Sequence, residues 1–284
     1  MPSYVNPEAL VTTDWLARHL HAPDVRVVDA SWYLPQENRD PRAEYDHAHI
    51  PGAVFFDIDE IADADSALPH MLPDPETFSS RVRGLGLGDG NRIIVYDGAG
   101  IRTAPRVWWM FRVFGHEDVA VLDGGLPKWR AEGRPLEDLP PAPRERRFTA
   151  RMNTMLVRTF DQVLRNVKER REQTVDARSA GRFDGTAPEP REGLRSGHIP
   201  GSLSLPYTEI LDPEGHTMLP ADKLRRAFED AGVDLRRPVV TTCGSGVTAA
   251  VLALGLHLLG HHETALYDGS WTEWASREDA PVAP

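Results

Sequence analysis

The sequence predicts an α/β protein made of two tandem copies of one domain, each with a mostly parallel sheet covered by helices on both faces. Three observations lead to this fold class. Short apolar runs alternate with helical stretches, four local motifs recur in the same order in the two halves, and a Pro-rich polar segment separates the halves. A repeat of about half of a 284-residue chain is far longer than the ~20–50 residues of a solenoid unit, so it indicates duplicated domains.

The recurring motifs place the two copies along the chain. A Val-Asp-Ala run at Val28 recurs at Val175, and His-Ile-Pro-Gly occurs at His49 and again at His198. The other two pairs are 93–101 with 239–247 and 122–129 with 267–274. The segment between the copies, Leu-Pro-Pro-Ala-Pro from Leu139, has the polar, Pro-rich character of a linker. We therefore expect a first domain over 1–137, a linker over 138–156 and a second domain over 157–284.

Within each copy, short apolar runs predict buried strands. They cover 26–29, 92–96 and 119–122 in the first copy and 174–176, 238–242 and 263–267 in the second. Longer apolar stretches at 106–114 and 247–259 predict helices, which Gly115 and Gly260 would end. Ligands of such sheets bind beyond the carboxyl ends of the strands. Cys243 follows the predicted strand 238–242 directly, so it stands at that edge.

Composition excludes several classes of protein. A net charge of −11 argues against general binding to nucleic acid or to an anionic membrane. No apolar run reaches the ~18–20 residues that span a bilayer, and the first residues do not resemble a signal peptide, so a cytoplasmic location is expected. The lone cysteine cannot form an internal disulfide or a Cys-based zinc cluster. His257 and His261 lack further ligand residues, and Gly84–Gly88 does not complete a dinucleotide motif; we expect no metal and no cofactor.

The loop that begins at Cys243 has the features of an anion-binding turn. Its sequence, Cys-Gly-Ser-Gly-Val-Thr, lies between a predicted strand and a predicted helix. Two glycines allow successive backbone N–H groups to turn inward, and the start of a helix adds partial positive charge. A thiolate, which is the reactive form of cysteine, is favoured in such a place. The first copy carries Asp97-Gly-Ala-Gly at the matching position, which keeps the turn and loses the sulfur.

Four interpretations of Cys243 compete. The plainest is a buried structural cysteine. A Cys-dependent phosphatase needs arginine six residues later, but Ala249 stands there. A cysteine protease needs a histidine base; the 11 histidines leave this open, although the flanking residues do not resemble papain-like or caspase-like signatures. The fourth is sulfur transfer, in which the cysteine holds a sulfur atom as a persulfide.

The motifs resemble those of two-domain sulfurtransferases of the rhodanese family over nearly the whole chain. The His-Ile-Pro-Gly motifs are similar to the family motif near the start of each domain, and Tyr-Asp-Gly-Ser-Trp at Tyr267 is similar to its C-terminal motif. The Cys243 loop is similar to that of 3-mercaptopyruvate sulfurtransferases, whereas thiosulfate sulfurtransferases typically carry Cys-Arg-Lys-Gly-Val-Thr. The resemblance implies two tandem rhodanese-like domains, the first inactive and the second catalytic.

The resemblance also implies roles for individual residues. Cys243 would be the nucleophile that takes the sulfur of 3-mercaptopyruvate and releases pyruvate. Arg182 and Arg191, in a stretch similar to the family's substrate loop, would bind the carboxylate and keto oxygen, because a guanidinium matches a carboxylate in shape and charge. Backbone amides would hold the sulfur and the substrate at Gly244, Gly246, Val247 and Thr248.

A proton relay is the last implied feature of the site. Ser245 would exchange a proton with the substrate thiol, and His70 and Asp59 would orient it in the manner of a catalytic triad. Because His70 and Asp59 belong to the first copy, this relay requires an interdomain active site. The two motif histidines would be structural, and Asp97 and Arg102 would contribute contacts.

Three functions stay open on the sequence. The first is 3-mercaptopyruvate sulfurtransferase, with a thiol such as thioredoxin, or cyanide, as sulfur acceptor. The second is thiosulfate sulfurtransferase, which moves sulfur from thiosulfate to cyanide. The third is a non-catalytic binding module with the rhodanese fold, against which the intact Cys243 loop argues.

Overall fold

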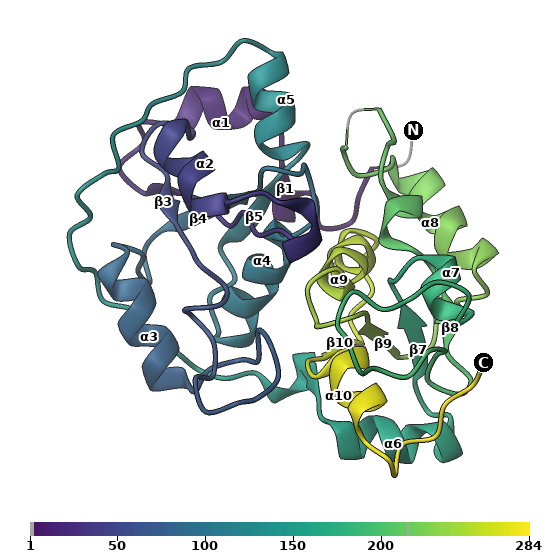
Figure 1. The fold of residues 1–284 in the computed structure, drawn as a ribbon. Coiled ribbons are helices and arrows are strands. Elements are labelled where there is room, and N and C mark those ends of the chain that lie inside the picture. The colour runs from purple at the N-terminus through teal and green to yellow at the C-terminus, as the bar shows by residue number, and fades with distance from the viewer. Residues whose placement is uncertain (1–2, 215) are drawn as a thin grey trace.

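The computed structural model describes residues 3–214 and 216–284, which form two lobes with similar architecture (Figure 1). Each lobe contains a five-stranded sheet in which every pair of neighbouring strands is parallel. The first sheet has the order β1-β5-β4-β2-β3 and the second has the equivalent order β6-β10-β9-β7-β8. The predicted fold class, two α/β domains with parallel sheets, is confirmed.

The first sheet and its helices lie within residues 10–131. Its strands are β1 (Leu10–Val11), β2 (Val25–Asp29), β3 (Val54–Phe55), β4 (Arg92–Tyr96) and β5 (Val119–Leu122). Its helices are α1 (Thr13–His19), α2 (Pro41–His47), α3 (Pro75–Gly84), α4 (Ala104–Val113) and α5 (Gly125–Ala131). Helices α1, α2 and α5 share one apolar cluster with one face of the sheet, and α3 and α4 share another with the opposite face. Burial on both faces explains why the central strands are continuous apolar runs.

The second sheet repeats this arrangement. Its strands are β6 (Val157–Arg158), β7 (Gln173–Asp176), β8 (Leu203–Ser204), β9 (Val239–Thr242) and β10 (Thr264–Tyr267). Its helices are α6 (Phe160–Glu169), α7 (Ala180–Phe183), α8 (Ala221–Asp230), α9 (Ala249–Leu258) and α10 (Ser270–Ser276). Helices α6 and α10 cover one face, while α8 and α9 cover the other. Short 3-10 helices complete the chain at η1 (Pro7–Ala9), η2 (Pro35–Glu37), η3 (Thr154–Leu156) and η4 (Tyr207–Ile210).

The predicted elements agree closely with the observed ones. The runs 92–96 and 119–122 coincide with β4 and β5, and each of the other four predicted strands differs by one residue at one end. The predicted helices 106–114 and 247–259 correspond to α4 and α9. The edge strands β1, β3, β6 and β8 were not predicted, because two residues are too few to form a hydrophobic pattern.

The two domains pack through a shared apolar core. Helices α4 and α9 lie side by side between the two sheets (Figure 1), and one continuous cluster of buried side chains contains residues of both. The N-terminal segment lies against the second domain, where Val5 N–H donates to Leu258 O at 2.8 Å and the Tyr4 hydroxyl donates to Leu219 O at 2.6 Å. Among the described residues, none of the helices combines the length and apolarity that crossing a bilayer requires.

Candidate active site

The loop of residues 243–248, here called the Cys243 loop, joins β9 to α9 at the carboxyl edge of the second sheet. Cys243 is 2% exposed, so its thiol is shielded from bulk water. Gly246 has a φ of +75°, and a Cβ at this position would lie 2.9 Å from Arg106 Nη1 and from Asp268 O. Glycine is therefore required here by both the backbone conformation and the close contact.

The carbonyl groups of the loop are bound to α10. Trp271 N–H donates to Cys243 O at 2.9 Å, and Thr272 donates to Gly244 O from its backbone N–H and from its hydroxyl. The backbone N–H groups of residues 244–248 donate to no protein acceptor within the part of the chain that the structure describes. Buried amides without partners are rare in proteins, so this set indicates a site that binds an anion.

A cavity of about 190 Å³ opens above the Cys243 loop. Trp32, Leu34, Arg102 and Thr103 of the first domain contribute one part of its wall. The second domain contributes Cys243, Ser245 and other residues of the loop, together with Arg182, Arg191 and Tyr207. We call this cavity the donor pocket. It lies between the domains, as the resemblance implied for the active site.

Two arginines of the second domain reach the donor pocket and differ in their surroundings. Arg182 donates from Nε and Nη2 to Glu189 Oε2, at 3.2 and 2.5 Å. Arg191 Nη2 lies 3.4 Å from His70 Nε2, and no carboxylate pairs with Arg191 within the described residues. Burial lowers the pKa of Arg191, the charge of Cys243 opposes this shift, and Arg182 adds to it. Arg191 is therefore the cation of this wall that is open to an incoming anion.

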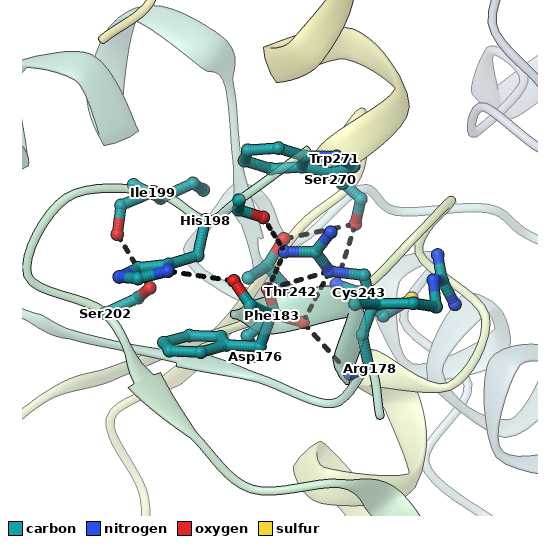
Figure 2. Close-up of polar contacts among 12 residues, drawn as sticks. Asp176, Arg178, Phe183, His198, Ile199, Ser202, Thr242, Cys243, Ser270 and Trp271 are labelled. Atoms are coloured by element: carbon teal, nitrogen blue, oxygen red, sulfur yellow. Dashed lines mark hydrogen bonds and ion pairs between the residues drawn. The ribbon is translucent and has the colours of Figure 1, made fainter. Parts of the chain in front are cut away.

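A buried ion-pair network supports the wall behind Arg182. Arg178 pairs with Asp176 at 2.7 Å and with Glu189 at 2.7 Å, and its guanidinium stacks over the Trp271 ring at 4.3 Å. Figure 2 shows Asp176, Arg178 and Trp271 of this network beside Cys243. Because Glu189 binds both Arg178 and Arg182, it fixes the position of Arg182 and neutralises part of its charge.

His70 and Asp59 form a pair at the edge of the first domain. His70 Nδ1 lies 2.7 Å from Asp59 Oδ1, and Trp32 Nε1 donates to Asp59 Oδ2 at 2.8 Å. Burial lowers the pKa of His70; Asp59 opposes this shift, while Arg106 and Arg191 increase it. Burial raises the pKa of Asp59, but the hydrogen bond and charge of His70 outweigh it, so the net pKa is lowered. A neutral imidazole beside an ionised carboxylate is suited to accept and return a proton.

The structure brings part of the predicted relay together. His70 joins Asp59, whereas no hydrogen bond links His70 to Ser245 within residues 3–214 and 216–284. Ser245 lies in the pocket wall and is 6% exposed. His70 and Asp59 do not line the donor pocket, and His70 approaches it only through its contact with Arg191. The relay itself remains a prediction.

The motif histidines lie away from the donor pocket. His49 Nδ1 bonds with Tyr45 O at 2.7 Å, and His198 Nδ1 bonds with Phe183 O at 3.0 Å. Figure 2 shows His198 beside the Phe183 ring. Both hold turns. Among the described residues, no cluster of three or more His, Cys, Asp or Glu side chains is arranged to bind a metal ion.

Several residues in or beside the donor pocket were not identified as site residues from the sequence. Trp32 and Tyr207 line the donor pocket, and Glu189 positions Arg182. Trp32 lies on a loop of the first domain and Tyr207 begins η4 of the second, so no local pattern connects them. Glu189 carried one usable signal, because it lies between the two arginines in the same short loop.

Comparison with known proteins gives consistent results. Residues 12–132 and 159–277 each match the family description Rhodanese-like domain. A protein of Arabidopsis thaliana named thiosulfate/3-mercaptopyruvate sulfurtransferase 1, mitochondrial, is 47% identical over 97% of this chain and 78% of its own length. Human 3-mercaptopyruvate sulfurtransferase is 45% identical, and thiosulfate sulfurtransferase of Mus musculus is 46% identical; each alignment covers 95% of this chain and 92% of the relative.

Among solved structures, the 3-mercaptopyruvate sulfurtransferase SseA from Escherichia coli is similar, with a TM-score of 0.85 and 42% identity. The alignment covers 93% of this chain and 98% of SseA. The expected cytoplasmic location is overturned by the Arabidopsis relative, which is named as a mitochondrial protein. A relative this similar that is named as mitochondrial means that the character of the first residues does not assign the location.

The fold, the duplicated motifs and the relatives all indicate two tandem domains of one family. Each matched segment contains the helices and four of the five strands of its sheet, since β1 and β6 end just before the segments begin, and together the segments cover most of the chain. The relatives align over nearly the full length of both domains. The chain therefore belongs to the rhodanese family, with two rhodanese-like domains in tandem.

Proposed function

We propose that this chain is a sulfurtransferase that takes the sulfur of 3-mercaptopyruvate on Cys243, releases pyruvate and passes the sulfur to a thiol, such as that of thioredoxin, or to cyanide. The second domain, 157–284, carries the nucleophile, and the first domain, 1–137, is inactive but completes the pocket. The observation that carries this proposal is the position of the chain's only cysteine, beneath a pocket, in a loop where the N–H groups of residues 244–248 donate to no protein acceptor among the described residues.

The chemical step needs a nucleophile, a binding group and a proton carrier. The Cys243 thiolate attacks the thiol sulfur of 3-mercaptopyruvate, and a bond forms between the two sulfur atoms. The carbon–sulfur bond of the substrate breaks, and its electron pair stays on carbon as the enolate of pyruvate. The thiol proton moves to that carbon, so Cys243 persulfide and pyruvate are the products. The acceptor thiolate or cyanide then attacks the outer sulfur and restores the thiolate.

The residues around Cys243 are suited to these tasks. Arg191 binds the substrate carboxylate, and Arg182, held by Glu189, contacts the neighbouring oxygen. The amides of Gly244, Gly246, Val247 and Thr248 stabilise the negative outer sulfur of the persulfide. Ser245 transfers the proton, while His70 and Asp59 of the first domain act from beside Arg191. Bound substrate provides the connection between Ser245 and His70 that the side chains alone lack.

The charges of the pocket favour 3-mercaptopyruvate over thiosulfate. Glu189 pairs with Arg182, and Glu37 pairs with Arg102 at 3.0 Å, so Arg191 is the principal uncompensated cation. One such cation suits a donor with one carboxylate, whereas thiosulfate is a dianion. Gly244 and Ser245 add no charge to the loop. Thiosulfate remains the second candidate donor, because a relative with 46% identity is named thiosulfate sulfurtransferase.

The first test is the mass of the intact protein after incubation with each donor and removal of excess donor. We expect a gain of one sulfur atom, mapped to Cys243, and its loss when a thiol acceptor is added. A protein that gains no sulfur from 3-mercaptopyruvate or from thiosulfate would be a non-catalytic binding module.

The second test is the ratio of kcat/KM for the two donors in the wild type and in the Ser245→Lys variant. The wild type should favour 3-mercaptopyruvate. The Ser245→Lys substitution should reduce the preference for 3-mercaptopyruvate, because the new ammonium attracts the thiosulfate dianion and the hydroxyl proposed to carry the proton is gone. Gly244→Arg is less suitable, since even a Cβ at Gly244 would lie 2.9 Å from Arg182 Nη2. A wild type that prefers thiosulfate would reverse the choice of donor and leave sulfur transfer intact.

A further inference from the structure

Arg106 belongs to the first domain, yet its guanidinium reaches the loop that carries the cysteine of the second. It projects from α4, and its side chain is completely buried at the domain boundary. Nη1 donates to Asp268 Oδ1 at 2.6 Å and lies 3.3 Å from Gly246 O, within hydrogen-bond distance. Nη2 donates to His70 O. One guanidinium therefore joins the Cys243 loop to the segment that carries His70.

Both segments held by Arg106 have unusual backbone conformations. Gly246 has a φ of +75°, and His70 has a φ of 60°, which is uncommon for a residue with a side chain. Such conformations persist when the surrounding contacts enforce them. Asp268 adds a second contact to the same segment, because its Oδ2 accepts Leu72 N–H at 2.8 Å. The pair Arg106–Asp268 thus holds residues 70–72 against the second domain.

The duplicated fold provides an internal comparison for this pair. Asp123 follows β5 as Asp268 follows β10, and Asp123 Oδ1 accepts Met218 N–H across the boundary at 2.9 Å. His216, two residues before Met218, has a φ of 50° and so matches His70. The position that corresponds to Arg106 is the buried Leu252 on α9. The carboxylate contact therefore occurs at both of the equivalent places in the interface, around Asp268 and around Asp123. The arginine is present only at the contact with Asp268, which lies beside the Cys243 loop.

We infer that Arg106 is a positioning residue for sulfur transfer, which fixes His70 and the Cys243 loop in one arrangement across the domain boundary. This inference rests on the proposed function. If Arg106 only held the domains together, the equivalent interface around Asp123 would need a similar group. Arg106 does not line the donor pocket. Its loss should therefore affect the geometry of the reacting groups more than the binding of substrate.

The test compares Arg106→Met, Arg106→Lys and Asp268→Asn with Asp123→Asn as the matched control. For each variant, kcat and KM for 3-mercaptopyruvate are measured together with the single-turnover rate of sulfur loading on Cys243 and the stability in urea. We expect Arg106→Met to lower kcat and the loading rate by ~10–100-fold, the cost of a small misplacement of reacting groups, with KM changed by less than about threefold. Arg106→Lys should regain part of the loss, and Asp123→Asn should stay within about twofold of the wild type.

Several outcomes would overturn the inference. Arg106 would be only a structural contact if its variants kept a normal kcat per folded molecule, or if they changed KM alone. The same conclusion would follow if Asp123→Asn lowered kcat as much as Arg106→Met does. If Arg106→Met does not fold, Asp268→Asn decides, because it keeps an oxygen for Leu72 N–H but removes the charge that holds Arg106. A wild type that loads no sulfur would instead contradict the proposed function, so the two failures are distinguishable.

Discussion

Each domain carries an equivalent loop at the carboxyl edge of its own sheet, and the two loops differ in the groups that accept hydrogen bonds from their amides. In the first domain, Asp97 stands in the place of Cys243 and is completely buried. Its Oδ1 accepts the N–H of Ala99 at 2.8 Å, and its Oδ2 accepts three further amides at 2.8–2.9 Å. Those three amides belong to Arg102, Thr103 and Ala104. The first-domain loop therefore binds its own carboxylate.

This difference explains how one backbone can be either structural or reactive. A turn between a strand and a helix N-terminus presents several N–H groups to one point, and it needs a negative group there. Asp97 supplies that group permanently, and the loop becomes a stable part of the core. In the Cys243 loop the amides stay available, and the expected occupant is the negative sulfur of the persulfide. Loss of the carboxylate is thus as important for activity as gain of the cysteine.

The largest effect should come from Cys243→Ser, which removes the feature that most separates the loops. A hydroxyl ionises far less readily than a thiol and cannot hold a persulfide. Turnover should fall by roughly 10³-fold or more, while unfolding in urea should match the wild type because the side chains are similar in size. Measurable sulfur loading of the serine variant would contradict the role of Cys243.

The next effect should be on stability, from Asp97→Ala in the inactive loop. Four amides, two of them buried and two partly buried, would lose their acceptor, which should lower the free energy of unfolding by ~3 kcal/mol. Asp97→Asn keeps one carbonyl oxygen as an acceptor, so its free energy of unfolding should fall by less than that of Asp97→Ala. Urea unfolding of both variants measures the difference. Full stability of Asp97→Ala would mean that the carboxylate does not hold this loop, and the comparison between the domains would fail.

Binding of the substrate carboxylate should depend chiefly on Arg191 of the second domain. Removing one partner of a charge-assisted pair costs roughly 1.5–3 kcal/mol, so Arg191→Ala should raise KM for 3-mercaptopyruvate about tenfold to a hundredfold, with kcat less affected. Arg18→Ala, which removes an exposed arginine from the far side of the first domain, is the control and should leave KM unchanged. An unaltered KM in Arg191→Ala would remove this residue from the carboxylate site.

The smallest effect concerns Asp123, the equivalent of Asp268 without an arginine partner. Burial raises the pKa of Asp123 to about 6, against the opposing hydrogen bond from Met218. An unfolded chain has a pKa near ~3.9 at this residue. The protonated group therefore favours the folded state below pH ~4, and this contribution is lost as the pH rises through about 6. The stability of the wild type relative to Asp123→Asn should fall by ~2 kcal/mol between pH 4 and 7. A difference that does not vary with pH would contradict the raised pKa.

Much of the fold follows from local patterns along the chain. The central strands β2, β4, β5, β9 and β10 are buried on both faces, so they are rich in apolar and β-branched residues and stand out from the helices. The central strand β7 has only one apolar residue, Val175, and the repeated Val-Asp-Ala motif helps to locate it. The edge strands pair on one side over two residues only and leave no such pattern. The duplication of His-Ile-Pro-Gly and of the glycine-rich loops revealed two domains, because the same backbone turns need the same residues twice.

The sequence by itself also singled out Cys243 as the proposed nucleophile, since a single cysteine in a glycine-rich turn after a strand leaves one candidate. Arg182 and Arg191 were identified from their motif, but the difference in their pairing was not. Glu189 neutralises Arg182 and leaves Arg191 available for the substrate. This difference depends on rotamers and packing, which sequence distance does not report. The separation of His70 from Ser245 is likewise a property of the interface.

What only the tertiary structure decided is how the domains meet. Arg106, Asp268 and His70 are distant in the chain, and no sequence spacing connects them. The buried guanidinium of Arg106 nevertheless binds both Asp268 and the carbonyl oxygen of His70. Local sequence specifies strands, turns and helix ends because these depend on neighbouring residues. Contacts between domains depend on the shapes of two finished surfaces, so the ion pair at their boundary and the final geometry of the site arise only when both domains have folded and packed together.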